Sequence, residues 1–390
     1  ASPTPHLLLI EPALAWDPSA LIGVGSVAAH KLESFYASMH AYLADAGVDG
    51  VKVDAQAGLA QFGGSALVKE CVTAVESSVK VAFTGVRDKL PEPVEIRSRQ
   101  RGVLSRVRRW LGRAEEAAEV VVQEAATASP VHLVGCMCHS TDNLYNYMET
   151  TLIRASDDFY PRDTSAHSVH IVSCAYNSLM LGELAICDWD MFHSKHECAA
   201  LHAAARAISG GPVYISDPVG CHDSALLRRL VLADGRILRT TRPARPTVDC
   251  LFRDVMADKR TALKIWSTNN VGGIVGAFNV QGSKWDQRKR RYVDIDRPSS
   301  VTARVKPSDA HSIFGKGKGK GKAVRYVTWS AAKKEASVMS AADAELELEL
   351  EHRGWDLVTI QAVEELPIKA KPVKVGKGEE ESIGFSIFRR

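Results

Sequence analysis

The sequence lacks long apolar runs. No stretch approaches the roughly 18 consecutive apolar residues of a membrane-spanning helix, and the N-terminus has no basic segment followed by an apolar one, as a secretory signal has. A net charge of +3 over 390 residues is too small to indicate a nucleic-acid or membrane partner for the whole chain. We therefore expect a cytoplasmic protein. The chain begins at Ala1 without a methionine, so a removed targeting segment, for example one for plastids, stays open as an alternative.

The sequence also lacks the motifs of cofactor and metal chemistry. It has no dinucleotide fingerprint, and the Gly-Lys repeat at 315–322 does not have the spacing of a phosphate-binding loop. Among the eight cysteines, only Cys136 and Cys138, followed by His139, have a spacing that hints at a metal. Because no second pair follows at finger-like spacing, buried thiols are the better interpretation. We expect no cofactor and no metal.

What the sequence does contain is a helix followed by a strand that ends in a carboxylate. Residues 31–46 carry apolar side chains at helical spacing, Gly47 ends this helix, and residues 49–54 form a short strand that ends at Asp54. In a parallel (β/α) barrel, the C-terminal ends of the strands face the active site. Lys52 points to the same side of the strand as Asp54 and would keep that carboxylate ionised.

The same alternation of predicted strands and helices returns from residue 131 onward. The predicted helices cover 170–180 and 196–208, and Gly210 with Gly211 ends the second of them. Acidic residues follow or end the predicted strands, so a barrel active site is the natural interpretation. The strands and their acids are 131–137, 151–158 with Asp157 and Asp158, 184–192 with Asp188 and Asp190, and 212–217 with Asp217.

Beyond Cys221 the pattern changes to shorter alternating segments, which predict an antiparallel β-sandwich. We predict an α/β fold in which residues 1–225 form a (β/α)8-type barrel domain and residues 226–368 the sandwich domain. The arginine-rich stretch at about 87–130 is interpreted as a solvated surface insertion rather than a nucleic-acid site, and 315–322 as an exposed loop. The charged tail, 369–390, is expected to be mobile.

Several acids at strand ends, without a histidine cluster or a cofactor motif, favour chemistry on a neutral polyhydroxylated substrate. Retaining glycoside transfer needs an ionised carboxylate as nucleophile and a second carboxyl group as acid and base, about 5 to 5.5 Å away. Asp54 is the candidate nucleophile, and the pair Asp157 and Asp158 supplies the acid/base. Trp189 or Trp16 would stack on the face of a pyranose ring. Strand alternation places the side chain of Trp189 opposite those of Asp188 and Asp190. The candidate sugar-binding residues are Lys52, Arg154, Asp188, Asp190, Asp217, Trp189, Trp16 and Asp17.

Five segments resemble the plant raffinose synthase and seed imbibition protein family, which belongs to glycoside hydrolase family 36 and is similar in fold to the α-galactosidases. They are 49–54, 154–163, 188–194, 210–217 and 246–252, and the later segments 263–266 and 276–282 look like the C-terminal part of the family. The resemblance implies a retaining transfer of α-galactose with Asp54 as nucleophile. An Arg-x-x-x-Asp spacing from Arg154 selects Asp158 as acid/base, whereas the Ser-Asp step selects Asp157; both stay open, with Asp158 preferred.

The resemblance also implies departures and a choice of reactions. The family's N-terminal β-sandwich and first three barrel strands have no counterpart here, so the barrel is expected to lack its first strands. The leading hypothesis is transfer of galactose from galactinol to sucrose, giving raffinose and myo-inositol. The alternatives are an α-galactosidase acting on raffinose-family oligosaccharides and an inactive fragment or sugar-binding remnant. The expected partners are therefore small sugars, with no nucleic acid and no membrane.

Overall fold

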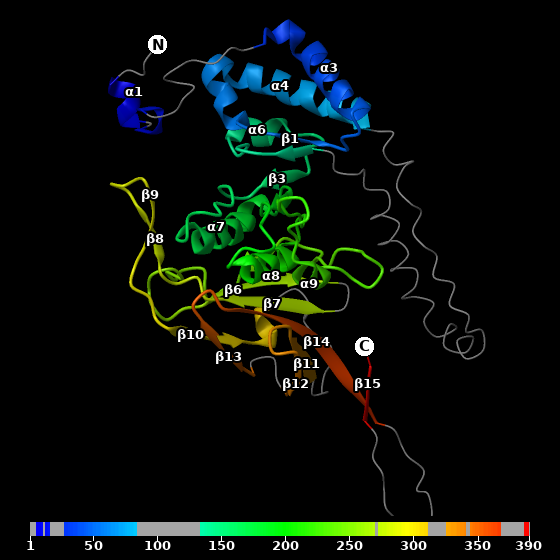
Figure 1. Cartoon of the computed structure of the whole chain (residues 1–390), viewed down its shortest axis with the longest axis vertical. Coiled ribbons are helices and arrows are strands. Elements are labelled where there is room, and N and C mark those ends of the chain that lie inside the picture. Colours follow the sequence, from blue (N-terminus) through cyan, green and yellow to red (C-terminus); the bar gives the residue numbers. More distant parts are fainter. Residues whose placement is uncertain are drawn as a thin grey trace, which may run out of the picture. The chain divides into compact units, whose positions relative to one another are not determined.

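The structure of the chain is a computed structural model that describes residues 5–10, 12–15, 27–83, 133–269, 272–310, 325–340, 344–367 and 386–389. The contacts divide it into two compact units, Ala1–Thr150 and Thr151–Arg390, and each is described by itself (Figure 1). No helix within these described ranges has the length and apolar character needed to cross a membrane. Trp16, Asp17, the arginine-rich stretch and the Gly-Lys repeat lie outside the described residues.

The first unit contains two parallel strands and two long helices. Strand β1 (Val51–Val53) pairs in parallel with β2 (Leu133–Gly135), and helices α3 (Leu32–Asp45) and α4 (Ala60–Phe83) pack against each other. The helix 31–46 and the strands around 51 and 133 that the sequence predicts are thus confirmed. The shorter elements of this unit are α1 (Pro5–Ile10), η1 (Pro12–Ala15), η2 (Ala29–Lys31), η3 (Gln56–Leu59) and α6 (Thr141–Asn146).

The apolar faces of these elements form a common core. Val75, Val79 and Phe83 of α4 are buried with Leu133 of β2. The carboxylate of Glu76, on the same helix and only 6% exposed, accepts hydrogen bonds from the backbone N–H groups of residues 148–150. A buried carboxylate therefore fixes the chain that follows α6, because charge-assisted bonds to backbone donors are among the stronger hydrogen bonds.

The second unit begins with a parallel pair and its helices. Strand β3 (Leu152–Arg154) pairs in parallel with β4 (Ile186–Asp188), with helix α7 (Ala166–Leu181) between them in sequence. Helix α8 (Ala199–Ser209) ends at Gly210, whose φ of +80° is a left-handed conformation that favours glycine. The predicted strand 212–217 is not a regular strand; it contributes one parallel bridge, between Ile215 and Phe192. A short helix, α9 (Ser224–Arg228), follows.

The rest of this unit is antiparallel. One sheet has the order β12-β11-β14-β7-β6-β5, with β15 added to β14, and the strands β10 and β13 form a pair. Their bounds are β5 (Arg245–Pro246), β6 (Leu263–Thr268), β7 (Gly273–Phe278), β10 (Ser300–Val305), β11 (Arg325–Ser330), β12 (Glu335–Met339), β13 (Leu346–Glu351), β14 (Trp355–Pro367) and β15 (Ser386–Arg389). Of the tail predicted to be mobile, the structure thus describes 386–389, which form β15.

A shared core makes the antiparallel part a sandwich. Burial alternates along β10, so Val301, Ala303 and Val305 face inward against Leu348 and Leu350 of β13 and against the larger sheet. The α/β fold and the antiparallel sheets are therefore confirmed, whereas closure of an eight-stranded barrel and a domain boundary at residue 225 stay predictions.

Helix α8 packs on the other side of the larger sheet at a glycine. A Cβ at Gly276 of β7 would lie 3.2 Å from the Cδ1 of Ile208 and 2.7 Å from the ring of Phe278. The absence of a side chain at this position lets the helix approach the strand closely. The remaining hairpin, β8 (Ser283–Asp286) and β9 (Arg291–Asp294), extends beyond the sheet (Figure 1).

Candidate active site

The parallel register of β3 and β4 brings an arginine beside an aspartate. Arg154 and Asp188 are register partners at the ends of the two strands, and the Nε of Arg154 lies 2.9 Å from the Oδ2 of Asp188. The guanidinium is 2% exposed and the Asp188 carboxylate is fully buried. Such a buried pair needs further polar partners, because desolvation of both charges is costly.

The other two guanidinium nitrogens of Arg154 contact two further acids. Its Nη2 lies 2.7 Å from the Oδ1 of Asp190, and its Nη1 lies 2.7 Å from the Oδ1 of Asp158. The Asp158 side chain is 59% exposed, whereas the Asp190 side chain is 5% exposed. One arginine therefore organises three carboxylates, and within this group only Asp158 is open to solvent.

Asp190 is held in place by its own backbone conformation and by a backbone donor. Its φ of +66° is a left-handed conformation that non-glycine residues seldom adopt. The N–H of Phe159 donates to the Asp190 Oδ2 over 2.7 Å. Burial raises the pKa of Asp190, but the Phe159 N–H and the charge of Arg154 outweigh it and lower that pKa. Asp190 is therefore an ionised acceptor.

A tyrosine that sequence reasoning missed completes this group. The hydroxyl of Tyr214 donates to the Asp188 carboxylate over 2.9 Å and lies 3.4 Å from the Asp190 Oδ1. Burial and the adjacent Asp188 charge raise the pKa of Tyr214, so the hydroxyl keeps its proton and remains a donor. The available signal was the position of Tyr214 in the 210–217 motif, three residues before Asp217.

The side chain of Trp189 does not stack on a sugar, contrary to one of the two roles considered for it. It is fully buried, and its indole N–H donates to the Oγ of Ser178 on α7. The predicted opposition of Trp189 to Asp188 and Asp190 is confirmed. This opposition explains why Trp189 cannot stack on a sugar, because a residue that points away from the site packs into the core behind it. Its carbonyl oxygen lies 2.9 Å from the Nε2 of His170.

The two consecutive acid/base candidates face different partners. Asp158 pairs with Arg154, whereas the Oδ2 of Asp157 accepts a hydrogen bond of 2.9 Å from the hydroxyl of Tyr292 on β9. The side chains of these two adjacent residues, in the loop after β3, thus contact different parts of the second unit. Asp217 lies apart from this contact network, because its carboxylate accepts from the backbone N–H and hydroxyl of Ser194.

The candidate nucleophile belongs to the other compact unit. Asp54 follows β1 directly and is exposed; its Oδ1 accepts a hydrogen bond of 2.7 Å from the N–H of Ala55. Ala55 has a φ of +58°, so the chain turns sharply after the acid. Lys52, in β1, is exposed. The structure thus places Asp54 at the C-terminal end of a parallel strand, as predicted from sequence.

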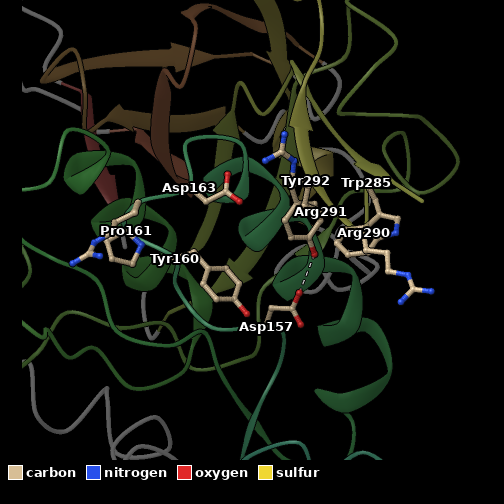
Figure 2. Close-up of a pocket in the computed structure, with 9 residues that line it drawn as sticks. Asp157, Tyr160, Pro161, Asp163, Trp285, Arg290, Arg291 and Tyr292 are labelled. Atoms are coloured by element: carbon tan, nitrogen blue, oxygen red, sulfur yellow. Dashed lines mark hydrogen bonds between the residues drawn. The ribbon is translucent and has the colours of Figure 1, made fainter. Parts of the chain in front are cut away.

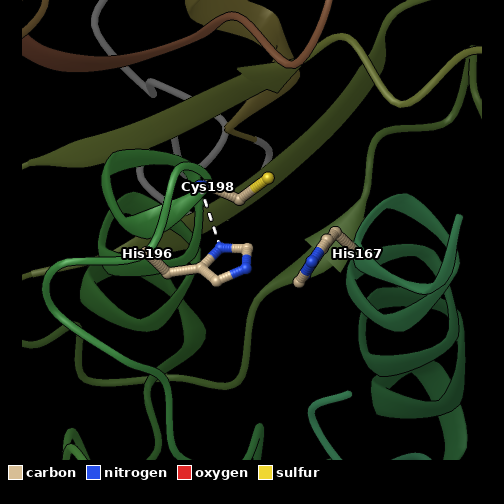
Figure 3. A group of neighbouring side chains, drawn as sticks. All are labelled: His167, His196 and Cys198. Atoms are coloured by element: carbon tan, nitrogen blue, oxygen red, sulfur yellow. Dashed lines mark hydrogen bonds between the residues drawn. The ribbon is translucent and has the colours of Figure 1, made fainter. Parts of the chain in front are cut away.

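The fold also assembles histidines that the sequence did not indicate as a cluster. His167, His196 and Cys198 are the one group with metal-ligand spacing within the described ranges, their ligand atoms lying within 4.8 Å of one another (Figure 3). The Nδ1 of His196 accepts from the Cys198 N–H and its Nε2 donates to the Pro161 carbonyl. The Sγ of Cys198 lies 3.2 Å from the Nη1 of Arg353.

The hydrogen-bond chain behind this group also fixes the tautomer of His167. Arg206 Nη1 donates to His202 Nδ1 over 2.7 Å, so the Nε2–H of His202 donates to the Nδ1 of His167 over 2.9 Å. The proton of neutral His167 then sits on Nε2, and burial lowers the pKa of His167 to about 4. The ring lone pairs of His167 and His196 thus already accept hydrogen bonds. The group of His167, His196 and Cys198 therefore fits a buried polar network better than a metal site.

The cysteines bear out the prediction of buried thiols. All eight are free; seven are buried and Cys221 is exposed. Cys136 and Cys138 belong to the buried set, in the segment after β2.

The α/β fold of this chain is similar to the folds of two solved structures. The structure is similar to a β-L-arabinopyranosidase of family GH27 from Geobacillus stearothermophilus, with a TM-score of 0.50, 14% identity, and coverage of 88% of this chain and 63% of that one. It is also similar to α-galactosidase I from Mortierella vinacea, with a TM-score of 0.50, 12% identity, and coverage of 84% and 71%. At these identities the likeness concerns the fold alone.

The sequence comparisons then give the family. The model of the family described as raffinose synthase or seed imbibition protein Sip1 matches residues 2–88 and 122–375, and the chain belongs to this family. It is 41% identical over 309 residues to a probable galactinol–sucrose galactosyltransferase 6 of Arabidopsis thaliana, covering 78% of this chain and 35% of the relative. It is 37% identical to a galactinol–sucrose galactosyltransferase of Oryza sativa, covering 96% and 42%. The chain therefore spans less than half the length of these curated relatives.

Proposed function

We propose that this chain carries the catalytic residues of a retaining α-galactosyl transfer, with galactinol as donor and sucrose as acceptor. The observation that carries the proposal is the Arg154 group: a buried arginine fixes two buried acceptors, Asp188 and Asp190, and one exposed carboxylate, Asp158. The exposed Asp158 carboxyl group, oriented by this arginine, is placed to act as an acid and a base toward a bound sugar, as retaining glycosyl transfer requires. The relatives named galactinol–sucrose galactosyltransferase support the same reaction class.

In the proposed mechanism, Asp54 attacks the anomeric carbon of the donor and forms a covalent galactosyl-enzyme intermediate. Asp158, or alternatively Asp157, protonates the leaving oxygen of myo-inositol and then takes the proton of the attacking sucrose hydroxyl. Arg154 orients Asp158. Asp188 and Asp190 are buried and hold Arg154 in place, so we assign them a positioning role instead of the sugar-binding role expected from the sequence. Hydrolysis of α-galactosides, the alternative reaction, uses the same residues with water in place of sucrose.

Product analysis of the purified chain with galactinol, with and without sucrose, tests the proposal. Raffinose and myo-inositol formed together support transfer, free galactose regardless of sucrose supports the α-galactosidase alternative, and no turnover supports the inactive or sugar-binding alternative. We expect Asp54→Asn to abolish turnover with both acceptors while the unfolding transition is retained. Near-normal turnover in that variant would refute the role of Asp54.

Azide rescue separates the two acid/base candidates. With a donor that has a good leaving group, an alanine variant of the acid/base forms the intermediate but lacks the base that activates the acceptor, so azide restores turnover. We expect rescue of Asp158→Ala and none of Asp157→Ala. The opposite pattern would assign the role to Asp157.

A further inference from the structure

A pocket of about 700 Å³ lies between the loop after β3 and the β8–β9 hairpin (Figure 2). The loop contributes Asp157, Tyr160 and the segment 161–163, and the hairpin contributes Trp285, Tyr292 and two arginines, Arg290 and Arg291. Small-molecule sites in proteins have volumes of about 300 to 1,000 Å³, so the pocket has the size of a ligand site. All of its lining residues belong to the second unit.

The aromatic side chains of this pocket form an open apolar surface. Trp285 is 49% exposed and its ring meets that of Tyr292 edge to face, with centroids 5.1 Å apart and an angle of 71° between the planes. The indole N–H of Trp285 donates to the side chain of Gln287 over 2.8 Å. Tyr160 adds a ring that is 46% exposed. Large, rigid aromatic faces of this kind match the apolar C–H face of a pyranose or furanose ring.

Polar side chains of both signs surround these rings. Asp157 and Asp163 are acidic, and Arg162, Arg290 and Arg291 are basic. Carboxylates accept hydrogen bonds from sugar hydroxyls, and guanidinium groups donate to hydroxyl and ring oxygens. An aromatic platform with donors and acceptors at its rim fits a neutral sugar, which presents both kinds of group.

The hairpin is tied to the loop that carries the acid/base candidates. The Tyr292 hydroxyl donates to Asp157 Oδ2 over 2.9 Å, and the Thr164 hydroxyl donates to Asp294 Oδ2 over 3.3 Å. Asp158, the next residue after Asp157, pairs with Arg154. The pocket and the Arg154 group therefore meet at two adjacent residues of one loop.

We propose that this pocket is the acceptor subsite, which binds a neutral disaccharide such as sucrose with Trp285 as its stacking platform. This inference rests on the proposed function, since it assigns the second substrate of the same reaction. It makes Trp285 a specificity-determining residue and not a catalytic one. A bound acceptor there would place a hydroxyl near the loop that holds the acid/base candidates.

The test uses the full 390-residue chain, Trp285→Ala, and Trp329→Ala as a matched control. Trp329, on β11, is similarly exposed at 45% and does not line the pocket. Direct binding of sucrose is followed by saturation-transfer NMR, which needs no turnover. We expect Trp285→Ala to weaken sucrose binding at least tenfold and Trp329→Ala to leave it unchanged. Equal binding by all three proteins would overturn the proposal, as would binding of myo-inositol phosphate but not sucrose, since that would mark an anion site.

Kinetics provide a second readout where the chain turns over. With an aryl α-galactoside as donor, we expect Trp285→Ala to raise the KM for sucrose at least tenfold and to raise the ratio of hydrolysis to transfer. We expect Trp329→Ala to leave both quantities unchanged. A lower rate of aryl release with an unchanged KM for sucrose would contradict the subsite. Loss of all turnover in the unmodified chain would count against the proposed reaction only, because the NMR experiment would still decide on the pocket.

Discussion

Replacement of Arg154 by methionine provides the sharpest test of how the site is held together. Methionine retains a long side chain but leaves Asp188 and Asp190, whose side chains are 0% and 5% exposed, without their cation. Removal of one partner from a buried ion pair destabilises a protein by about 3 to 5 kcal/mol, because the remaining charge stays desolvated and uncompensated. We expect a loss of about that size for Arg154→Met.

The control is Asp158→Asn, which removes the exposed partner of the same arginine. Its side chain is 59% exposed, and solvent-exposed pairs contribute about 0 to 1 kcal/mol. Urea denaturation of both variants, followed by tryptophan fluorescence, gives the comparison, and buried Trp189 reports directly on this region. Equal destabilisation by the two substitutions would refute the reasoning.

The pH dependence adds an independent check with a defined sign. In the unmodified chain the pKa of Asp190 is lowered, so its contribution to stability is present above the unfolded value, near 3.9, and is lost as the pH falls through the folded value. Without Arg154 the buried Asp190 carboxylate loses the charge that favours its ionised form, so its folded pKa rises. The deficit of Arg154→Met should therefore shrink between pH 7 and pH 5, and a constant deficit would contradict this account.

Three further predictions concern other parts of the molecule. Ala55→Gly should raise the free energy of unfolding, measured by urea denaturation, by about 1 kcal/mol, because Ala55 has a φ of +58° that glycine adopts without strain. Glu76→Gln should lower it by about 1 to 3 kcal/mol, because the backbone donors of 148–150 lose a charged acceptor; an unchanged midpoint would contradict the role of that carboxylate. Thiol titration of the native chain with Ellman's reagent should label Cys221 and no second cysteine, and Cys221→Ser should abolish the fast labelling.

Local patterns were sufficient to predict much of the fold. The helix at 31–46, the strands around 51, 133, 152 and 186, and the alternation that opposes Trp189 to Asp188 and Asp190 all follow from periodicities of a few residues, and the structure confirms them. The prediction of a strand at 212–217 was wrong, because this segment makes only one isolated β-bridge, at Ile215.

The contacts that define the site depend on residues far apart in sequence. Arg154 meets Asp188 through the register of two parallel strands, and Asp157 meets Tyr292 across 135 positions. No short-range period encodes such pairings, since they depend on how strands and loops are placed in space. The same reason explains why Tyr214 and the buried histidines were absent from the predicted site, whereas acids at strand ends were found from their position alone.

The arrangement of Asp157 and Asp158 gives a physical basis for separating two roles that one dipeptide left ambiguous. A galactosyl transferase must hold its acid/base beside the donor while it presents an acceptor in place of water. Asp158 is oriented by a buried arginine that Asp188 and Asp190 hold in place. Asp157 is hydrogen-bonded to a hairpin residue and lines the aromatic pocket. Because Asp157 and Asp158 are adjacent in the chain, one loop carries both the pocket proposed for the acceptor and the preferred candidate for the acid/base.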